Sequence, residues 1–215
     1  MDEAGRGPVL GPLVMAALVV DEEGEKKLRW LGVKDSKQLS SSAREELLER
    51  IREIVIDFRI EVIEPDAIDL SMTEAESNLN WLEAETAARM VSELAPDKAI
   101  IDCPSPNIPA YKNYFLERLS AGVKEKTEVV MEHKADVNHI SVAAASVIAK
   151  VIRDRQIEHI KEEIGVDFGT GYCSDPKTKD FLQKYHDKFP ELFRRCWQPY
   201  KDVVDGKKQR RLGEF

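Results

Sequence analysis

Residues 2–20 are Asp-Glu-Ala-Gly-Arg-Gly-Pro-Val-Leu-Gly-Pro-Leu-Val-Met-Ala-Ala-Leu-Val-Val, an acidic pair and a glycine-rich segment followed by an apolar run. The run from Leu13 to Val20 lies between a Gly-Pro pair and acidic residues, a pattern typical of a short strand buried on both faces. It is much shorter than the ~20 apolar residues that a membrane-spanning helix needs. We therefore expect this segment to be a strand of a buried sheet.

The rest of the chain alternates predicted strands with predicted helices. Ser42 and Glu45 have the spacing of a capping box at the start of one helix. Further strands are expected at 55–63, 98–102 and 127–131, and helices at 42–54, 74–94, 109–119, 140–164 and 177–189. This alternation predicts an α/β fold.

The composition is that of a soluble globular protein with one domain of ordinary size. Of 215 residues, 42% are hydrophobic and 33% are charged, and the net charge is -8. An acidic sum argues against nucleic-acid binding, but the charge is segregated, because residues 194–215 hold seven Lys and Arg against three Asp and Glu. Three widely spaced cysteines predict neither disulfides nor a zinc site. With no secretory signal and no membrane segment, a cytoplasmic protein is expected.

The glycine-rich segment near the start is the densest group of candidate binding residues. Gly5 and Gly7 allow backbone conformations closed to other residues, so N–H groups can approach a ligand closely, and Arg6 offers a cation for phosphate. A dinucleotide-binding fingerprint fails, because Leu10 stands where a third glycine is required. A Walker loop fails as well, because no Gly-Lys-Ser/Thr follows.

Four acids are candidates for a metal site. Taken alone, Asp2 and Glu3 are more typical of a solvated surface pair, but the neighbouring glycines favour a binding role. Asp102 ends an apolar strand, where an unpaired buried carboxylate would be costly, so a ligand or catalytic role is favoured. Asp136 precedes the long helix, where an acid also complements the helix dipole. If their segments meet at one sheet edge, these oxygen ligands suit Mg²⁺ or Mn²⁺, and pairs of such ions catalyse in-line displacement at phosphorus.

Six segments resemble, in order, the signature blocks of ribonuclease HII, the type 2 ribonuclease H, and together they span nearly the whole chain. They are 2–7, 34–39, 101–102, 133–136, 143–150 and 169–177. The resemblance implies an RNase H-like fold, a mixed five-stranded sheet flanked by helices, over residues 1–165. It implies a substrate-contacting loop and a small helical C-terminal extension over residues 166–205.

The same resemblance implies an endoribonuclease that hydrolyses the RNA strand of RNA/DNA hybrids. It would also incise 5′ of ribonucleotides embedded in duplex DNA, leaving 3′-hydroxyl and 5′-phosphate ends. The four acids named above are implied to be catalytic and to bind two Mn²⁺ or Mg²⁺ ions. The backbone of Gly5, Arg6 and Gly7 is implied to sense the ribose 2′-hydroxyl.

Two further substrate contacts are implied by the resemblance. Tyr172 matches the family tyrosine that stacks on the sugar following the ribonucleotide, and Gly169 and Gly171 favour an exposed loop position over a buried one. Lys37 is implied to contact phosphates near the site.

The last ten residues, 206–215, are predicted to be a basic docking tail. Gln209, Leu212 and Phe215 resemble the Q-x-x-L-x-x-F peptide by which replication and repair proteins bind the sliding clamp (PCNA). A frayed basic terminus is the alternative interpretation. The position of the motif at the end of the chain points to an archaeal member of the family, and a monomer is expected.

One departure from the family pattern leaves a second function open. Family members carry hydrophobic residues before the acidic pair, forming the first half of the central strand, whereas here Asp2 directly follows Met1. A misplaced start codon is the simpler explanation. A truly truncated strand would favour a non-catalytic, clamp-bound reader of RNA/DNA hybrids. A resolvase of the same superfamily, which would cut junctions, is a third alternative.

Overall fold

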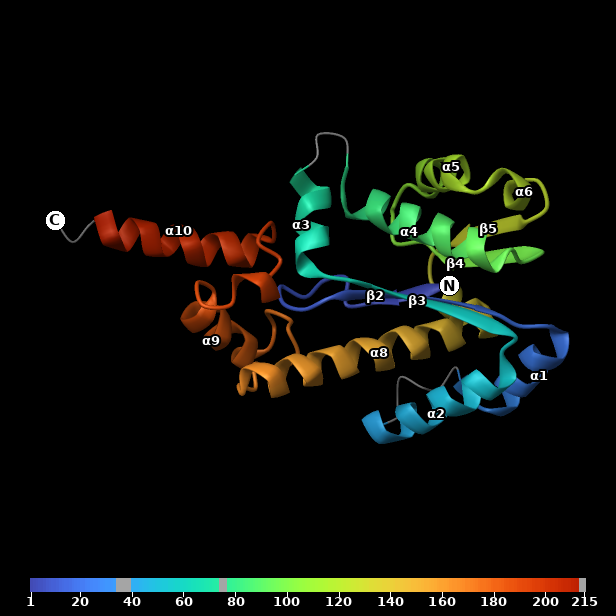
Figure 1. Ribbon diagram of the computed structural model, residues 1–215, viewed down its shortest axis with the longest axis horizontal. Coiled ribbons are helices and arrows are strands. Elements are labelled where there is room, and N and C mark those ends of the chain that lie inside the picture. Colours follow the sequence, from blue (N-terminus) through green and yellow to red (C-terminus); the bar gives the residue numbers. More distant parts are fainter. Residues whose placement is uncertain (34–39, 74–76, 213–215) are drawn as a thin grey trace.

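The computed structural model describes residues 1–33, 40–73 and 77–212, with side chains through residue 206. Lys37 and Phe215 lie outside the described residues, and the side chains of Gln209 and Leu212 are likewise not described. Within the described ranges, five strands and the helices around them form the mixed α/β architecture that the sequence predicts (Figure 1).

Two groups of strands make up the β structure. In the first group β2 (Leu13–Val19) pairs antiparallel with both β1 (Asp2–Ala4) and β3 (Asp57–Ile63). In the second group β4 (Lys98–Asp102) pairs in parallel with β5 (Glu128–Glu132). The mixture of parallel and antiparallel pairs agrees with the expected mixed sheet.

Main-chain hydrogen bonds of Met1 join the two groups. The Met1 nitrogen donates to the Ile100 carbonyl at 2.9 Å, and the Asp102 nitrogen donates to the Met1 carbonyl at 3.1 Å. The start of β1 is therefore hydrogen-bonded to β4. Strand β1 thus lies between β2 and β4, and β5 lies beyond β4. This junction brings the acidic pair of β1 beside the carboxyl end of β4.

Helices cover both faces of the strands (Figure 1). On one face lie α4 (Leu79–Leu94), α5 (Ile108–Arg118) and α6 (Ala121–Lys124). On the other lie α1 (Glu22–Trp30), α2 (Ser41–Ile54) and α8 (Ile140–Ile164). The 140–164 prediction for α8 is confirmed, and Gly165 ends the helix in the left-handed conformation.

The side chains of β2 show why this strand is central. Leu13 and Met15 belong to the core cluster shared with α4 and α5, whereas Val14 and Ala16 belong to the cluster shared with α2 and α8. All four are at most 3% exposed. Successive strand residues point to opposite faces, so one apolar run supplies both cores. The prediction of a strand buried on both faces is confirmed.

Some predicted boundaries are wrong. Helix α2 is capped by Ser40, whose hydroxyl accepts a hydrogen bond from the Ala43 nitrogen, so the capping box at Ser42 is not used. Helix α4 begins at Leu79, after its Asn78 cap and five residues after the predicted start at 74, and Pro65–Thr73 form the separate helix α3. Strand β3 begins two residues later than expected. Caps and turns depend on local side-chain bonds that hydrophobic periodicity does not reveal.

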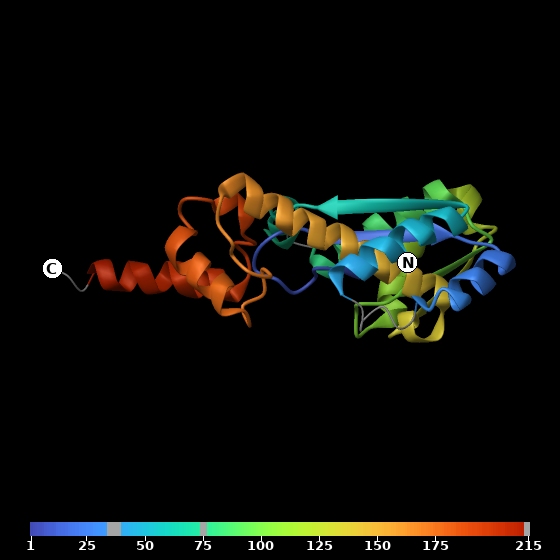
Figure 2. The ribbon, with the colours of Figure 1, turned by 90° about the horizontal axis from the view of Figure 1, so that it is seen from below.

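The C-terminal region packs on the glycine-rich segment and extends away from the sheet (Figure 2). It contains α9 (Pro176–Tyr185), the 3₁₀ turn η2 (Pro190–Leu192) and α10 (Gln198–Leu212). Its core joins Phe168, Phe181 and Phe193 to Val9 and Leu10 from the start of the chain. Helix α10 crosses the expected boundary between residues 205 and 206. No described helix is long and apolar enough to cross a membrane.

Candidate active site

The two acids of β1 point to opposite faces of the sheet. Asp2 is paired with Ala16, and Glu3 is paired with Met15. Directly paired residues of antiparallel strands share a face. Asp2 therefore faces α8, where Ser146 hydrogen-bonds it, and Glu3 faces α4. Adjacent acids in the sequence thus enter the site from two sides of one strand.

The other two predicted acids lie beside this strand end. Asp102 is the last residue of β4, and its Oδ1 accepts a hydrogen bond from the Ala135 nitrogen at 3.3 Å. Ala135 begins the short helix α7 (Ala135–Asn138), and this helix contains Asp136. The charge of Asp136 contributes to raising the pKa of Asp102. The structure therefore brings Asp2, Asp102 and Asp136 together at one end of β1 and β4.

These carboxyl groups are held in an unfavourable environment when they are ionised. Burial raises the pKa of Asp2 to about 6, although bonds from Ser146 and from the Glu3 nitrogen oppose the shift. Burial, with the nearby charges of Glu83 and Asp2, raises the pKa of Glu3 well above its usual value. Burial also raises the pKa of Asp102. Mutually repelling buried carboxylates are stabilised by a bound cation.

The fit to a metal ion is partial. Among the residues that the structure describes, no group of three or more His, Cys, Asp or Glu side chains has the geometry of a metal site. Mg²⁺ in phosphoryl-transfer sites needs only one or two carboxylates, because substrate phosphates supply further oxygens. The oxygen-only donor set therefore fits a hard divalent ion that binds together with substrate.

A cleft of about 300 Å³ lies next to these acids. Its lining residues come from β1, the glycine-rich segment, α8 and the loop before α9, and they are Glu3, Ala4, Gly5, Arg6, Gly7, Ser146, Lys150, Arg153 and Tyr172. The predicted substrate residues of the glycine-rich segment and Tyr172 thus meet in one cleft. Tyr172 is 39% exposed, so it is available to a ligand.

The side chain of Arg6 is bound within the protein. Its Nε donates to both carboxylate oxygens of Glu83, at 2.9 and 3.2 Å, and its Nη2 donates to Asn80 Oδ1 at 2.7 Å. The expectation that Arg6 offers its cation to phosphate is not tested by this geometry, but the charge is already balanced by Glu83. The main chain around Arg6 remains part of the cleft lining.

One buried guanidinium donates hydrogen bonds to several carbonyl groups of the glycine-rich segment. Arg194 is 0% exposed, and its Nη atoms donate to the carbonyls of Gly5 at 2.5 Å and Arg6 at 2.8 Å, while its Nε donates to the carbonyl of Gly11 at 3.1 Å. Gly5 has φ +84°, and a Cβ there would lie 2.7 Å from the Pro12 carbonyl oxygen. Burial lowers the pKa of Arg194 to about 10, so it remains a cation at neutral pH.

A second buried arginine links the cleft to the loop that carries Tyr172. The Arg153 guanidinium lies 5.4 Å from the centre of the Tyr172 ring, and its Nη2 donates to the Thr170 carbonyl. Gly171 packs against this guanidinium with φ +84° and leaves no room for a Cβ beside the Leu10 carbonyl. Arg153 therefore positions the tyrosine loop against the start of the chain.

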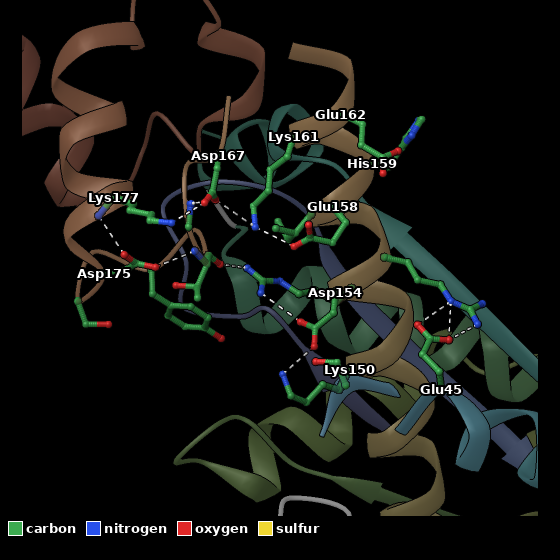
Figure 3. Close-up of a pocket in the computed structure, with 18 residues that line it drawn as sticks. Glu45, Lys150, Asp154, Glu158, His159, Lys161, Glu162, Asp167, Asp175 and Lys177 are labelled. Atoms are coloured by element: carbon green, nitrogen blue, oxygen red, sulfur yellow. Dashed lines mark hydrogen bonds and ion pairs between the residues drawn. The ribbon is translucent and has the colours of Figure 1, made fainter. Parts of the chain in front are cut away.

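A larger groove of about 960 Å³ continues from the cleft along α8, and the two share Lys150, Arg153 and Tyr172 (Figure 3). Its cations are paired with acids: Lys150 lies 3.2 Å from Asp154, and Lys177 lies 2.5 Å from Asp167. The six Asp and Glu along the groove outnumber its five Lys and Arg. The groove is therefore not a basic patch.

Sequence reasoning missed three residues that shape the site: Glu83, Arg153 and Arg194. Glu83 stands among apolar residues on the inner face of α4, and Arg153 does so on α8, so a charge at a buried helical position was an available signal. No comparable signal marks Arg194, which stands next to Arg195 in a basic stretch.

The sequence model of the ribonuclease HII family matches residues 1–200. The chain belongs to the ribonuclease HII family. It is 40% identical over 214 residues to ribonuclease HII of Pyrococcus furiosus, covering 98% of this chain and 92% of that relative. With a ribonuclease HII of Thermococcus sibiricus it shares 45% identity over 210 residues, covering 95% and 90%. Ribonuclease HII proteins are ribonucleases H, so this chain is an endoribonuclease that acts on RNA/DNA hybrids.

A solved structure agrees with this assignment. The crystal structure of the ribonuclease H2 from Pyrococcus horikoshii OT3 matches with a TM-score of 0.86 at 37% identity and covers 97% of each chain. Both the expected family and the expected RNase H-like fold are therefore confirmed. The individual roles of the site residues in this ribonuclease HII chain stay predictions.

Replacing Arg194 by Lys should destabilise the protein by about 1–3 kcal/mol, because one ammonium cannot reproduce the planar set of donors that serves three carbonyls, two of them in buried hydrogen bonds. Urea unfolding measures this loss. Arg195→Lys is the matched control, since Arg195 pairs with Asp66 and Asp69 and its side chain is 45% exposed. Equal stability of the two variants would contradict the role given to Arg194.

Replacing Asp2 by Asn should stabilise the metal-free protein increasingly as pH rises from about 4 to 7. The pKa of Asp2 is raised from 3.8 to about 6, so the folded state binds more protons in this window and loses stability as pH rises. The variant has no ionisable side chain at this position and does not undergo this loss of stability, which amounts to about 3 kcal/mol over the whole window. Urea unfolding of both proteins in EDTA, at the two ends of the pH window, measures the effect. A difference in stability between variant and wild type that does not change with pH would show that the pKa of the carboxyl is not perturbed.

Proposed function

We propose that this ribonuclease incises 5′ of ribonucleotides embedded in duplex DNA, as well as within RNA/DNA hybrids, and leaves 3′-hydroxyl and 5′-phosphate ends. One observation carries the proposal. The cleft beside the acids combines the main chain of Gly5, Arg6 and Gly7 with the exposed ring of Tyr172. Such a cleft can test one sugar for its 2′-hydroxyl without reading a long stretch of RNA.

The residues of this cleft have distinct proposed tasks. The backbone of Gly5–Gly7 hydrogen-bonds the 2′-hydroxyl, the group that distinguishes RNA from DNA. The ring of Tyr172 stacks on the sugar that follows the ribonucleotide, and Gly7 lies beside it, since a Cβ on Gly7 would be 3.7 Å from Tyr172 Cε1. The cleft also contains Glu3, so the recognised nucleotide is positioned directly beside the acids.

We further propose that Asp2, Glu3, Asp102 and Asp136 hold two Mn²⁺ or Mg²⁺ ions together with the scissile phosphate. Bound there, the ions would activate the attacking water and stabilise the departing oxygen. The raised pKa values of Asp2 and Asp102 support this assignment, because these groups gain most when a cation accompanies their ionisation.

Purified protein with Mn²⁺ or Mg²⁺ should cut a labelled duplex that carries one ribonucleotide, and the cut should lie on the 5′ side of that ribonucleotide. The matched all-DNA duplex should stay intact. Asp102→Asn should lower the rate by at least about 100-fold, since it removes a charge at the reacting centre. Asp97→Asn is the matched control, because Asp97 is exposed just before the opposite end of β4. Gel analysis of product ends measures both. Incision unaffected by Asp102→Asn would refute the assignment; no incision at all would favour the non-catalytic reader.

A sliding clamp is the proposed protein partner. One structural relative, matching with a TM-score of 0.82 at 39% identity over 94% of each chain, is the RNase HII of a PCNA:RNase HII complex from Archaeoglobus fulgidus. In this chain the residues proposed to bind the clamp are Gln209, Leu212 and Phe215. Helix α10 carries the end of the chain away from the sheet (Figure 2). We propose that the enzyme acts as a monomer.

Deletion of residues 209–215 should abolish clamp binding while cleavage in the absence of clamp stays unchanged. The lining of the cleft, as far as the structure describes it, comes from residues between Glu3 and Tyr172. Calorimetric titration with purified clamp measures affinity. Replacing Arg210 and Arg211 by Ala is the control, because it lowers the charge and keeps the three docking side chains. Clamp affinity unchanged by the deletion would exclude docking through the tail.

A further inference from the structure

A buried carboxylate in the middle of helix α4 has no role in the mechanism proposed above. Glu83 is 0% exposed, and an isolated buried carboxylate is strongly unfavourable. Its two oxygens both accept from the Nε of Arg6, which lies 77 positions earlier in the chain. A buried carboxylate that pairs with a distant arginine is costly to keep, so we infer that it has a role that an apolar residue could not fill.

Asn80 completes the contact. It lies one turn before Glu83 on the same face of α4 and accepts from the Arg6 Nη2 at 2.7 Å. Two acceptors on one rigid helix therefore hold the guanidinium at two of its nitrogens, which fixes both its position and the orientation of its plane. Because Arg6 stands between two glycines, its side chain is the part of the Gly5–Gly7 segment through which a helix can anchor it.

The same segment is also held by Arg194, which binds the carbonyls of Gly5 and Arg6. Because the carbonyls and the Arg6 side chain are fixed by separate partners, the peptide planes between Gly5 and Gly7 are held in one orientation. Their orientation decides where the N–H groups point within the cleft. Recognition of a hydroxyl by main-chain N–H groups depends on such preorganisation, since a displacement of about 1 Å can lower the rate about 100-fold.

We propose that Glu83 is a positioning residue for ribonucleotide recognition, holding Arg6 so that the Gly5–Gly7 backbone keeps the shape that receives the 2′-hydroxyl. This inference rests on the proposed function of that backbone. Glu83 also pairs with the Arg6 guanidinium, so in this proposal the segment discriminates by hydrogen bonding to the sugar.

A competing role would connect Glu83 to the acids. The charge of Glu83 contributes to the raised pKa of Glu3, so the two carboxylates are near each other. If Glu83 served the metal site through Glu3, its removal would change the Mn²⁺ dependence of cleavage. If it serves Arg6, its removal changes the affinity for the ribonucleotide duplex. These two effects are separable by experiment.

The test uses the full chain and measures kcat, KM and half-saturating Mn²⁺ on a duplex with one ribonucleotide. Glu83→Gln, which keeps the size and removes the charge, should raise KM about 10- to 100-fold with half-saturating Mn²⁺ unchanged. Arg6→Gln should give a similar rise, and the double variant should be no worse than Arg6→Gln alone. Glu93→Gln is the control on the same helix; Glu93 forms an exposed pair with Arg59 and should have no effect.

The outcomes separate the two proposals. Additive effects of Glu83→Gln and Arg6→Gln, or a shifted Mn²⁺ requirement with unchanged KM, would overturn the positioning role. Thermal unfolding identifies a variant that does not fold, and Asn80→Ala, which removes one acceptor and adds no buried charge, then provides the same KM comparison. Failure of the wild-type enzyme to cut the single-ribonucleotide duplex would instead refute the proposed function itself.

Discussion

The guanidinium of Arg194 is the interaction on which the site depends. The glycine-rich segment turns sharply, with φ +84° at Gly5 and φ +85° at Gly11, and directs its carbonyls inward, where water does not reach them. Buried carbonyls without donors are costly. Arg194 supplies those donors from 183 or more positions later in the chain, so the start of the chain acquires its shape only when the C-terminal region is in place.

This dependence explains why the C-terminal region packs where it does. Phe193 lies in the core cluster with Val9 and Leu10, and the Arg194 nitrogen donates to the Val9 carbonyl at 2.9 Å. The apolar contact supplies the burial that keeps water from the carbonyls, and the adjacent arginine satisfies them. Residues 166–206 therefore serve as a structural part of the cleft as well as the carrier of Tyr172.

The sequence predicts those elements of the fold that have a regular local pattern of residues. Strand β2 and helix α8 follow from an apolar run and from a long segment without Gly or Pro, and Asp102 follows from its place at the end of a strand. Contacts between distant residues are a different matter. The sequence marks Arg6 as a candidate binding residue and places Glu83 among apolar positions of a helix, but only the tertiary structure shows that the two side chains form a pair. The family resemblance implies a helical extension that overlaps the start of α10, but the sequence pattern does not predict α10 as an element, because it has no apolar stripe.

The placement of charge bears on how an acidic protein with net charge -8 can act on nucleic acid. The groove along α8 contains more carboxylates than Lys and Arg, and its cations are engaged in ion pairs, so it offers little attraction for phosphates (Figure 3). Arg6, the cation within the Gly5–Gly7 segment, is paired with Glu83, and Arg194 is fully buried and donates to main-chain carbonyls of the glycine-rich segment. General electrostatic affinity for duplexes would bind all-DNA and ribonucleotide-containing DNA alike. Because both cations are engaged by groups of the protein, hydrogen bonding to the sugar is the interaction that differs between the two duplexes, and rigid main-chain donors are suited to detect that difference.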